Sequence, residues 1–195
     1  MVPPAIESVM SEAIVPDLDR GVVLVGLMGA GKSSVGRRLA KRLRLPFFDA
    51  DQEIEKAAGC SINEIFSRHG EAAFRSGERR VIARLLDSGA HVLATGGGAF
   101  MDPETRAAIH DKGISIWLNA ELEVLLERVL RRDNRPLLKQ GDPEKILRRL
   151  IAERSPVYAL ADLTVTSGQG PHENVVDQIV EALQHRTAVG AKDGV

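Results

Sequence analysis

The chain has 195 residues, of which 44% are hydrophobic, 27% are charged and 4% are aromatic, and its formal net charge is −1. This composition is typical of one globular α/β domain with an aliphatic core, and the near-neutral charge excludes a global field that would recruit nucleic acid or an acidic membrane. The single cysteine excludes an internal disulfide and a cysteine-based metal cluster.

Residues 1–20 are expected to form a loosely ordered arm. They contain three prolines and four acidic residues, and they lack the basic start and apolar run of a secretory signal. No apolar stretch elsewhere in the sequence approaches the length of a membrane span. We therefore expect a cytoplasmic protein whose folded domain covers residues 21–185.

After the arm, predicted strands and helices alternate. The expected strands are residues 21–25, 45–49, 91–95, 114–118 and 162–166. Helices are expected from their apolar stripes around residues 35–43, 51–58, 61–69, 71–87, 103–111, 122–130, 143–158 and 175–183. Such alternation predicts a parallel sheet with helices on both faces. Residues 133–143 lack a period and form a predicted loop, and residues 186–195 form a predicted frayed tail.

The first strand runs into a glycine-rich turn. Residues 26–33 read GLMGAGKS and match G-x-x-x-x-G-K-[ST], the Walker A phosphate loop. Its glycines let backbone N–H groups surround phosphate oxygens, the following helix adds its dipole, and Lys32 adds a positive charge. The hydroxyl of Ser33 is placed to hold a magnesium ion that rides on the nucleotide. A turn that binds nothing is the alternative, but the strand before it and the helix after it favour nucleotide binding. The residues expected to contact ATP here are Gly29, Ala30, Gly31, Lys32, Ser33 and Ser34.

Polar or glycine residues also follow the next two strands. Asp49 and Asp51 are two residues apart, so an extended segment directs both carboxylates to the same side. Gly96, Gly97 and Gly98 would let a small ligand contact the backbone without interference from side chains. Each pattern has a structural alternative: the first can be a helix cap, and the second can be a tight turn. Because ligands of open parallel sheets bind beyond the carboxyl ends of the strands, both segments are candidate site residues.

Three arginines have a similar ambiguity. Arg75 and Glu78 are three apart on a predicted helix and can form an ordinary surface pair. Arg135 lies in the predicted loop, and Arg154 lies late in a predicted helix. Each is compatible with a solvated position when it is taken alone. A shared site is favoured because Arg75-x-x-Glu78, the triple glycine and Arg135-Pro136-Leu137-Leu138 follow the phosphate loop in this order.

In these motifs the sequence resembles the shikimate kinases. The resemblance extends from about Gly21 to Leu183 and is carried by the following motifs: the phosphate loop, Asp49-Ala-Asp51, Phe74-Arg75-x-x-Glu78, Gly96-Gly97-Gly98, Arg135-Pro-Leu-Leu138 and Arg154-x-Pro156-x-Tyr158. It implies a P-loop fold of the nucleoside-monophosphate-kinase type, with five parallel strands in the order 2-3-1-4-5. It also implies that residues 131–143 form a lid over ATP, and that the γ-phosphate of ATP passes to the 3-hydroxyl of shikimate.

The resemblance further implies how the acceptor is bound. Arg75 and Arg154 would bind the shikimate carboxylate as planar forks, with Glu78 orienting the first of them. Backbone N–H groups of Gly97 and Gly98 would complete the pocket. Asp51 would accept hydrogen bonds from the ring hydroxyls and act as a base, or only orient the reacting hydroxyl.

The resemblance also assigns residues to ATP and magnesium. Asp49 would join Ser33 in holding Mg²⁺, through water. Lys32 and Arg135 would neutralise charge on the transferring phosphoryl group. Arg128 would stack on adenine, although a solvated helical arginine is an alternative there. We expect ATP and shikimate as partners of a monomer, with no nucleic acid and no membrane.

Two other functions are weighed against this one. A GTPase switch module would need a guanine-reading Asn-Lys-x-Asp and a switch Asp-x-x-Gly, and neither occurs in the sequence. Another small-molecule kinase, for gluconate or a nucleoside monophosphate, is a closer alternative. The triple glycine and Arg135-Pro136 argue against it.

Overall fold

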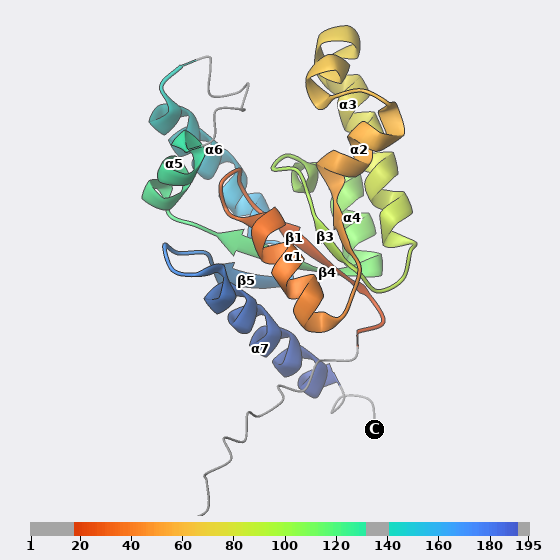
Figure 1. Cartoon of the computed structure of the whole chain (residues 1–195), viewed down its shortest axis with the longest axis vertical. Helices are drawn as coiled ribbons and strands as arrows, with labels where there is room; N and C mark the ends of the chain where they lie inside the picture. Colours follow the sequence, from red (N-terminus) through yellow and green to blue (C-terminus); the bar gives the residue numbers. More distant parts are fainter. Residues whose placement is uncertain (1–17, 132–140, 191–195) are drawn as a thin grey trace, which may run out of the picture.

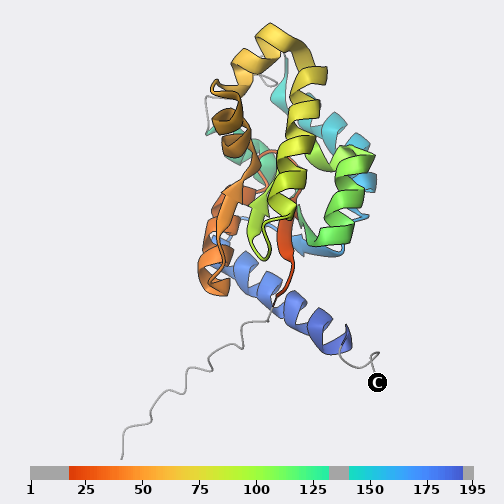
Figure 2. The same cartoon turned by 90° about the vertical axis from the view of Figure 1, so that its right-hand side faces the viewer.

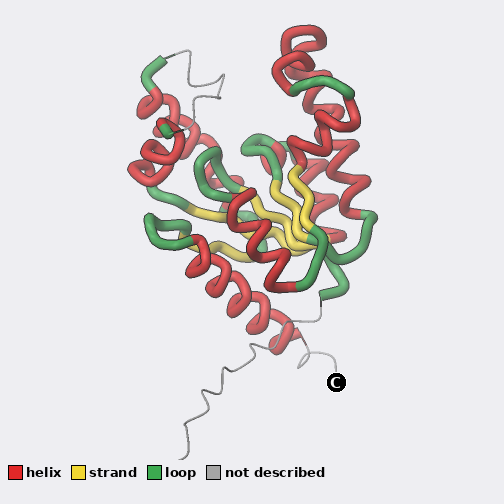
Figure 3. The backbone as a smooth tube through the Cα atoms, viewed as in Figure 1, coloured by secondary structure: helices red, strands yellow, loops and turns green. Residues whose placement is uncertain are grey.

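Five strands form one parallel sheet in the order β2-β3-β1-β4-β5, which confirms the expected topology. The structure is a computed structural model that describes residues 18–131 and 141–190. The strands are β1 Gly21–Val25, β2 Phe47–Asp49, β3 Val92–Ala94, β4 Gly113–Asn119 and β5 Leu163–Thr166. Figure 3 shows the strands side by side, with helices around them.

Helices follow the strands along the chain. They are α1 Lys32–Leu43, α2 Ala50–Ala58, α3 Ile62–Leu86, the 3₁₀ turn η1 Ala99–Met101, α4 Pro103–Lys112, α5 Leu122–Leu130, α6 Pro143–Tyr158 and α7 His172–Gly190. Helices α1 and α7 pack together on one face of the sheet, and α4, which packs against α3, lies on the other face (Figures 1 and 2). No helix of the described residues is long and apolar enough to cross a membrane.

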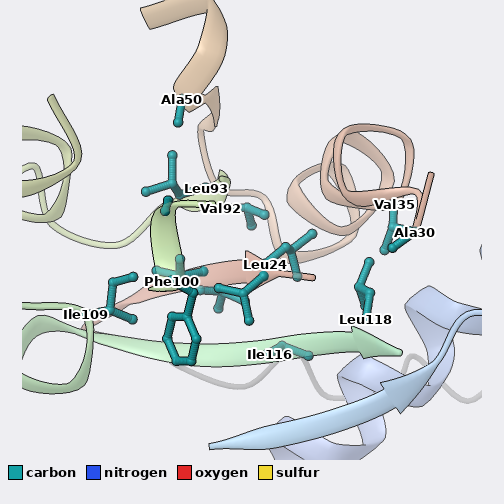
Figure 4. Close-up of a cluster of buried hydrophobic side chains, with 14 of the residues drawn as sticks. Leu24, Ala30, Val35, Ala50, Val92, Leu93, Phe100, Ile109, Ile116 and Leu118 are labelled. Atoms are coloured by element: carbon teal, nitrogen blue, oxygen red, sulfur yellow. The ribbon is translucent and has the colours of Figure 1, made fainter. Parts of the chain in front are cut away.

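The core is built on the central strand. All five residues of β1 are buried, as expected for a parallel strand that is covered on both faces. Figure 4 shows Leu24 of this strand together with Leu93 of β3 and Ile116 of β4. Phe100 of η1 and Ile109 of α4 belong to the same cluster. This rigid aliphatic core supports the loops at the carboxyl ends of β1, β2 and β3.

Some local features differ from the sequence expectations. The helices expected at 61–69 and 71–87 are both present, but they join end to end as α3 across a kink at Gly70, where φ is 78° and ψ is 174°. Ser61 caps this element in a capping box with Glu64. The turn η1 was not expected. Helix α7 continues to Gly190, so the first part of the predicted tail is helical.

Parts of three predicted segments lie outside the described residues. These parts are residues 1–17 of the arm, residues 132–140 of the lid, and residues 191–195 of the tail.

Candidate active site

The register of the sheet brings three loops to one edge. Leu24 of β1, Asp49 of β2 and Ala94 of β3 lie level with one another. The chain leaves each strand within two residues of that level, so the phosphate loop, the second aspartate and the glycine run emerge next to one another. This is the carboxyl edge where open parallel sheets bind ligands.

The phosphate loop has the backbone that its glycines predict. Gly26, Gly29 and Gly31 have φ values of 136°, 83° and 93°, a region that other residues rarely adopt. Helix α1 begins at Lys32 without a side-chain cap, which leaves the helix N-terminus open toward an anion. The ammonium of Lys32 donates hydrogen bonds to the carbonyls of Gly26 at 2.7 Å and Leu27 at 2.9 Å. The structure thus holds the expected cation inside the loop. The other residues expected to contact ATP, Ala30, Ser33 and Ser34, belong to this turn and to the first turn of α1.

The two residues expected to hold a metal ion lie together. The hydroxyl of Ser33 donates a hydrogen bond of 2.6 Å to Oδ2 of Asp49. The described residues contain no group of three or more histidine, cysteine or acidic side chains that could hold a metal ion. A hydroxyl and one carboxylate nevertheless fit Mg²⁺, which takes few protein ligands when nucleotide phosphates and water supply the rest.

Two carboxylates converge on the glycine run. A Cβ atom at Gly96 would lie 2.9 Å from Oε1 of Glu78 and 3.0 Å from Oδ1 of Asp51. Asp51 is exposed, whereas the side chain of Glu78 is buried. The expected alternative for this segment is also present, because the side chain of Asp49 caps α2 by accepting a bond from the backbone N–H of Asp51. Asp49 therefore serves as a cap, while Asp51 is directed toward the glycines.

Glu78 and Arg75 form a half-buried pair next to the same glycines. Nη1 of Arg75 donates a 2.7 Å hydrogen bond to Oε2 of Glu78. Burial raises the pKa of Glu78, although Arg75 counteracts this effect. Burial lowers the pKa of the Arg75 guanidinium, but Glu78 and Glu71 together outweigh burial, and the pKa is raised. A Cβ at Gly98 would lie 2.6 Å from Nη1 of Arg75, so a side chain at that position would have to displace the guanidinium. The pair is thus part of the site and not a solvated surface pair.

The second arginine reaches the glycine run from α6. Nη1 of Arg154 donates to the carbonyl of Gly97 at 2.8 Å, and the hydroxyl of Tyr158 donates to the same oxygen. Arg75 and Arg154 thus come from helices far apart in the sequence and lie next to Gly98 and Gly97. Two guanidinium groups therefore approach consecutive glycines at the carboxyl edge of the sheet.

Arg128 is anchored beside the phosphate loop. Its guanidinium donates to the carbonyl of Gly29 at 3.3 Å, to the hydroxyl of Ser167 at 3.1 Å and to the carbonyl of Gly168. The hydroxyl of Ser167 in turn donates to the carbonyl of Ala30 at 2.8 Å. These bonds rule out the freely solvated arginine that the sequence left open, and they leave the expected contact with adenine as a prediction.

The comparisons with known proteins agree with this geometry. A family model described as shikimate kinase matches residues 28–184, which is more than half of the chain. The chain belongs to the shikimate kinase family. A shikimate kinase from Rhodopseudomonas palustris is 63% identical over 165 residues, which cover 85% of this chain and 81% of that one. The solved structure of a shikimate kinase from Acinetobacter baumannii in complex with shikimate has a TM-score of 0.82 at 39% identity, and the match covers 86% of this chain and 94% of that one.

The gluconate alternative gains no support from structural similarity. A gluconokinase from Sinorhizobium meliloti matches at a TM-score of 0.58 and 17% identity, with 92% of this chain and 100% of that one covered. At this identity the two proteins share the fold alone. Membership of the shikimate kinase family therefore rests on much closer relatives.

Within this shikimate kinase, the structure groups the expected site residues and adds others. Arg135 lies outside the described residues, so its role stays a prediction. Ser167, which contacts the phosphate loop from beyond β5, was missed, and no local pattern marks it. The bond from Tyr158 to Gly97 was also not predicted, although the motif Arg154-x-Pro156-x-Tyr158 places Tyr158 one helical turn after Arg154 and on the same face.

Proposed function

We propose that this chain transfers the γ-phosphoryl group of ATP to the 3-hydroxyl of shikimate. The observation that carries the proposal is the convergence of two arginines, from α3 and α6, on consecutive glycines next to a phosphate loop. Family membership supports the same activity.

The acceptor would bind through its carboxylate. A carboxylate and a guanidinium form paired, charge-assisted hydrogen bonds, and two guanidinium groups hold the anion in one orientation. Arg75 is already fixed by Glu78, and Arg154 is fixed by Gly97. The clamp therefore loses little side-chain entropy when the substrate binds.

The hydroxyl groups of the acceptor would face the carboxylate of Asp51. This carboxylate accepts hydrogen bonds and can hold the reacting hydroxyl in line with the phosphoryl group. Phosphoryl transfer passes through a loose transition state, so the attacking hydroxyl keeps its proton until late. Orientation is then the main contribution of Asp51, and its basicity matters less.

Charge on the phosphoryl group would be neutralised from the nucleotide side, opposite Asp51. The N-terminus of α1 and Lys32 face the phosphates, and Arg135 is expected to join them from the lid. Ser33 and Asp49 would hold Mg²⁺, which when bound supplies positive charge at the phosphate oxygens.

The test is a coupled assay of ADP formation by the purified full chain. Shikimate, gluconate and nucleoside monophosphates are compared as acceptors at equal concentrations, with Lys32→Ala as the inactive control. ADP formation should depend on shikimate, and the phosphorylated acceptor should carry its phosphate on the 3-hydroxyl by ³¹P NMR. Preference for gluconate or a nucleotide would overturn the proposal.

A further inference from the structure

Tyr158 is a buried side chain whose hydroxyl reaches the active site. It is the single tyrosine of the chain, and its relative exposure is 0%. Its ring stacks on Phe100 and Trp117, at centroid distances of 6.4 and 5.9 Å. A hydroxyl in such surroundings needs a partner, because an unmade hydrogen bond inside a protein is costly. The partner is the carbonyl of Gly97.

The same carbonyl also accepts the bond from Arg154. Tyr158 follows Arg154 by one turn of α6, so both side chains project from the same face of that helix. A carbonyl oxygen has two lone pairs, and here each is used by one of these donors. Gly97 is therefore fixed to α6 at one atom by two side chains.

This bond matters because of the glycines around it. Three consecutive glycines have the greatest backbone freedom of any tripeptide, so an unanchored run would sample many conformations. The peptide between Gly97 and Gly98 is planar, and fixing its oxygen restricts the whole unit. That unit connects the contacts of Arg154 with those of Arg75, whose Nη1 would lie 2.6 Å from a Cβ at Gly98.

We propose that Tyr158 is a positioning residue for the acceptor: its hydroxyl fixes the Gly97 carbonyl, and that carbonyl fixes the guanidinium plane of Arg154 for an anionic substrate. The inference rests on the proposed function, because it takes the carboxylate of shikimate as the anion. One N–H of Arg154 donates to the carbonyl of Gly97, and this bond fixes the direction in which the remaining N–H groups of the planar guanidinium point.

The donor role of Tyr158 does not change near neutral pH. Burial raises the pKa of the phenol to about 12, so the hydroxyl keeps its proton at neutral pH and well above it. Ionisation of Tyr158 therefore adds no pH dependence to substrate binding.

Replacement of the hydroxyl alone tests the proposal. In Tyr158→Phe the ring and its stacking stay, and we expect the KM for shikimate to rise about tenfold while the KM for ATP changes less than about twofold. Trp117→Phe is the matched control, because it changes the ring packing against Tyr158 but not the bond to Gly97. This control should lower the melting temperature without moving the ratio of the two KM values.

A double-mutant cycle shows whether Tyr158 acts through Arg154. Arg154→Ala removes the group that is positioned, so adding Tyr158→Phe should raise the Kd for shikimate by no more than about twofold further. Fully multiplicative effects of the two substitutions would mean that Tyr158 acts independently, and the proposal would then be wrong.

A second measurement leaves the hydroxyl of Tyr158 in place. Because the chain has one tyrosine, growth on 3-fluorotyrosine labels position 158 alone. The ¹⁹F signal should shift when shikimate binds to the labelled protein, and the shift should vanish in labelled Arg154→Ala at shikimate concentrations that saturate it. An unchanged signal with bound shikimate would overturn the positioning role. If the unsubstituted chain does not phosphorylate shikimate, the proposed function fails first. If it does and Tyr158→Phe matches it in both KM values, this inference alone fails.

Discussion

The hydroxyl of Ser33 and the carboxylate of Asp49 meet at 2.6 Å, which joins the first turn of α1 to the end of β2. Two segments separated by a whole helix thereby form one polar site at the edge of the sheet. The bond also holds next to each other the two side chains proposed to bind Mg²⁺, Ser33 directly and Asp49 through water.

This pair predicts the metal requirement. In Asp49→Asn the negative charge is lost while the shape is kept, so the Mg²⁺ concentration for half-maximal activity should rise about tenfold or more. A Mg²⁺ titration of the ADP assay measures this concentration, with Glu53→Gln in the following helix α2 as a control for a nearby lost charge. If Asp49→Asn has the Mg²⁺ requirement of the unsubstituted chain, Asp49 is not part of the metal site.

Asp51 should affect turnover more than nucleotide binding. In Asp51→Asn the carboxylate that orients the hydroxyl is lost, and turnover should fall by about 10²-fold or more. The Kd for ATP, measured by calorimetry, should stay nearly the same because Asp51 lies on the acceptor side. Turnover within about a factor of three of the unsubstituted chain would remove Asp51 from the mechanism.

Loss of the Ser167 hydroxyl should change the KM for ATP alone. In Ser167→Ala, Ala30 loses a buried donor and Arg128 loses one of its acceptors. The KM for ATP should rise about five- to tenfold, because a hydrogen bond that shapes the phosphate loop is lost. The KM for shikimate should change little. Ser67→Ala, on an exposed turn of α3, serves as the control, and an equal effect on both substrates would contradict a role specific to the nucleotide.

Because His91 is buried, the free energy of unfolding should depend on pH. It is fully buried against Phe48, and its Nε2 has no hydrogen-bond partner among the described residues. Burial lowers its pKa, so below the ordinary value of about 6.5 the unfolded chain binds a proton that the folded chain resists. The free energy of unfolding should therefore fall as the pH drops through 6.5, with a slope of up to about 1.4 kcal/mol per pH unit.

Urea unfolding between pH 7.5 and 5.5 measures this slope. His91→Leu should flatten it, whereas substitution of the exposed His110 by Gln should not. A slope that is the same in His91→Leu and in the unsubstituted chain would assign the pH dependence to other groups.

The sequence predicted most of what depends on local pattern. The phosphate loop and the two helical segments that meet at Gly70 each follow from the pattern of neighbouring residues, and the structure contains both. The strand order followed from the resemblance to a known family. The features that the sequence did not predict depend on contacts between distant segments. Ser167 contacts Ala30 across 137 residues, and Tyr158 contacts Gly97 across 61. Such contacts are decided by the packing of the sheet and its helices, which no local period encodes.

The solvated alternatives for Arg75 and Arg128 show the same limit. Spacing alone allowed either residue to lie on the surface, since i, i+3 pairs and helical arginines usually do. The close approach of Gly98 to Arg75, and the three acceptors around Arg128, appear once the fold is formed.

The carboxylate clamp is the central claim, and a comparison of shikimate with its amide tests it most directly. The unsubstituted chain should bind the acid about 30-fold more tightly than the uncharged amide, which corresponds to about 2 kcal/mol for lost charge-assisted hydrogen bonds. Arg75→Ala and Arg154→Ala should each weaken the acid by a similar factor and the amide by much less, with the Kd for ATP little changed in both. Equal affinity of the unsubstituted chain for the acid and the amide would contradict the clamp, and the acceptor would then have to be sought among uncharged compounds.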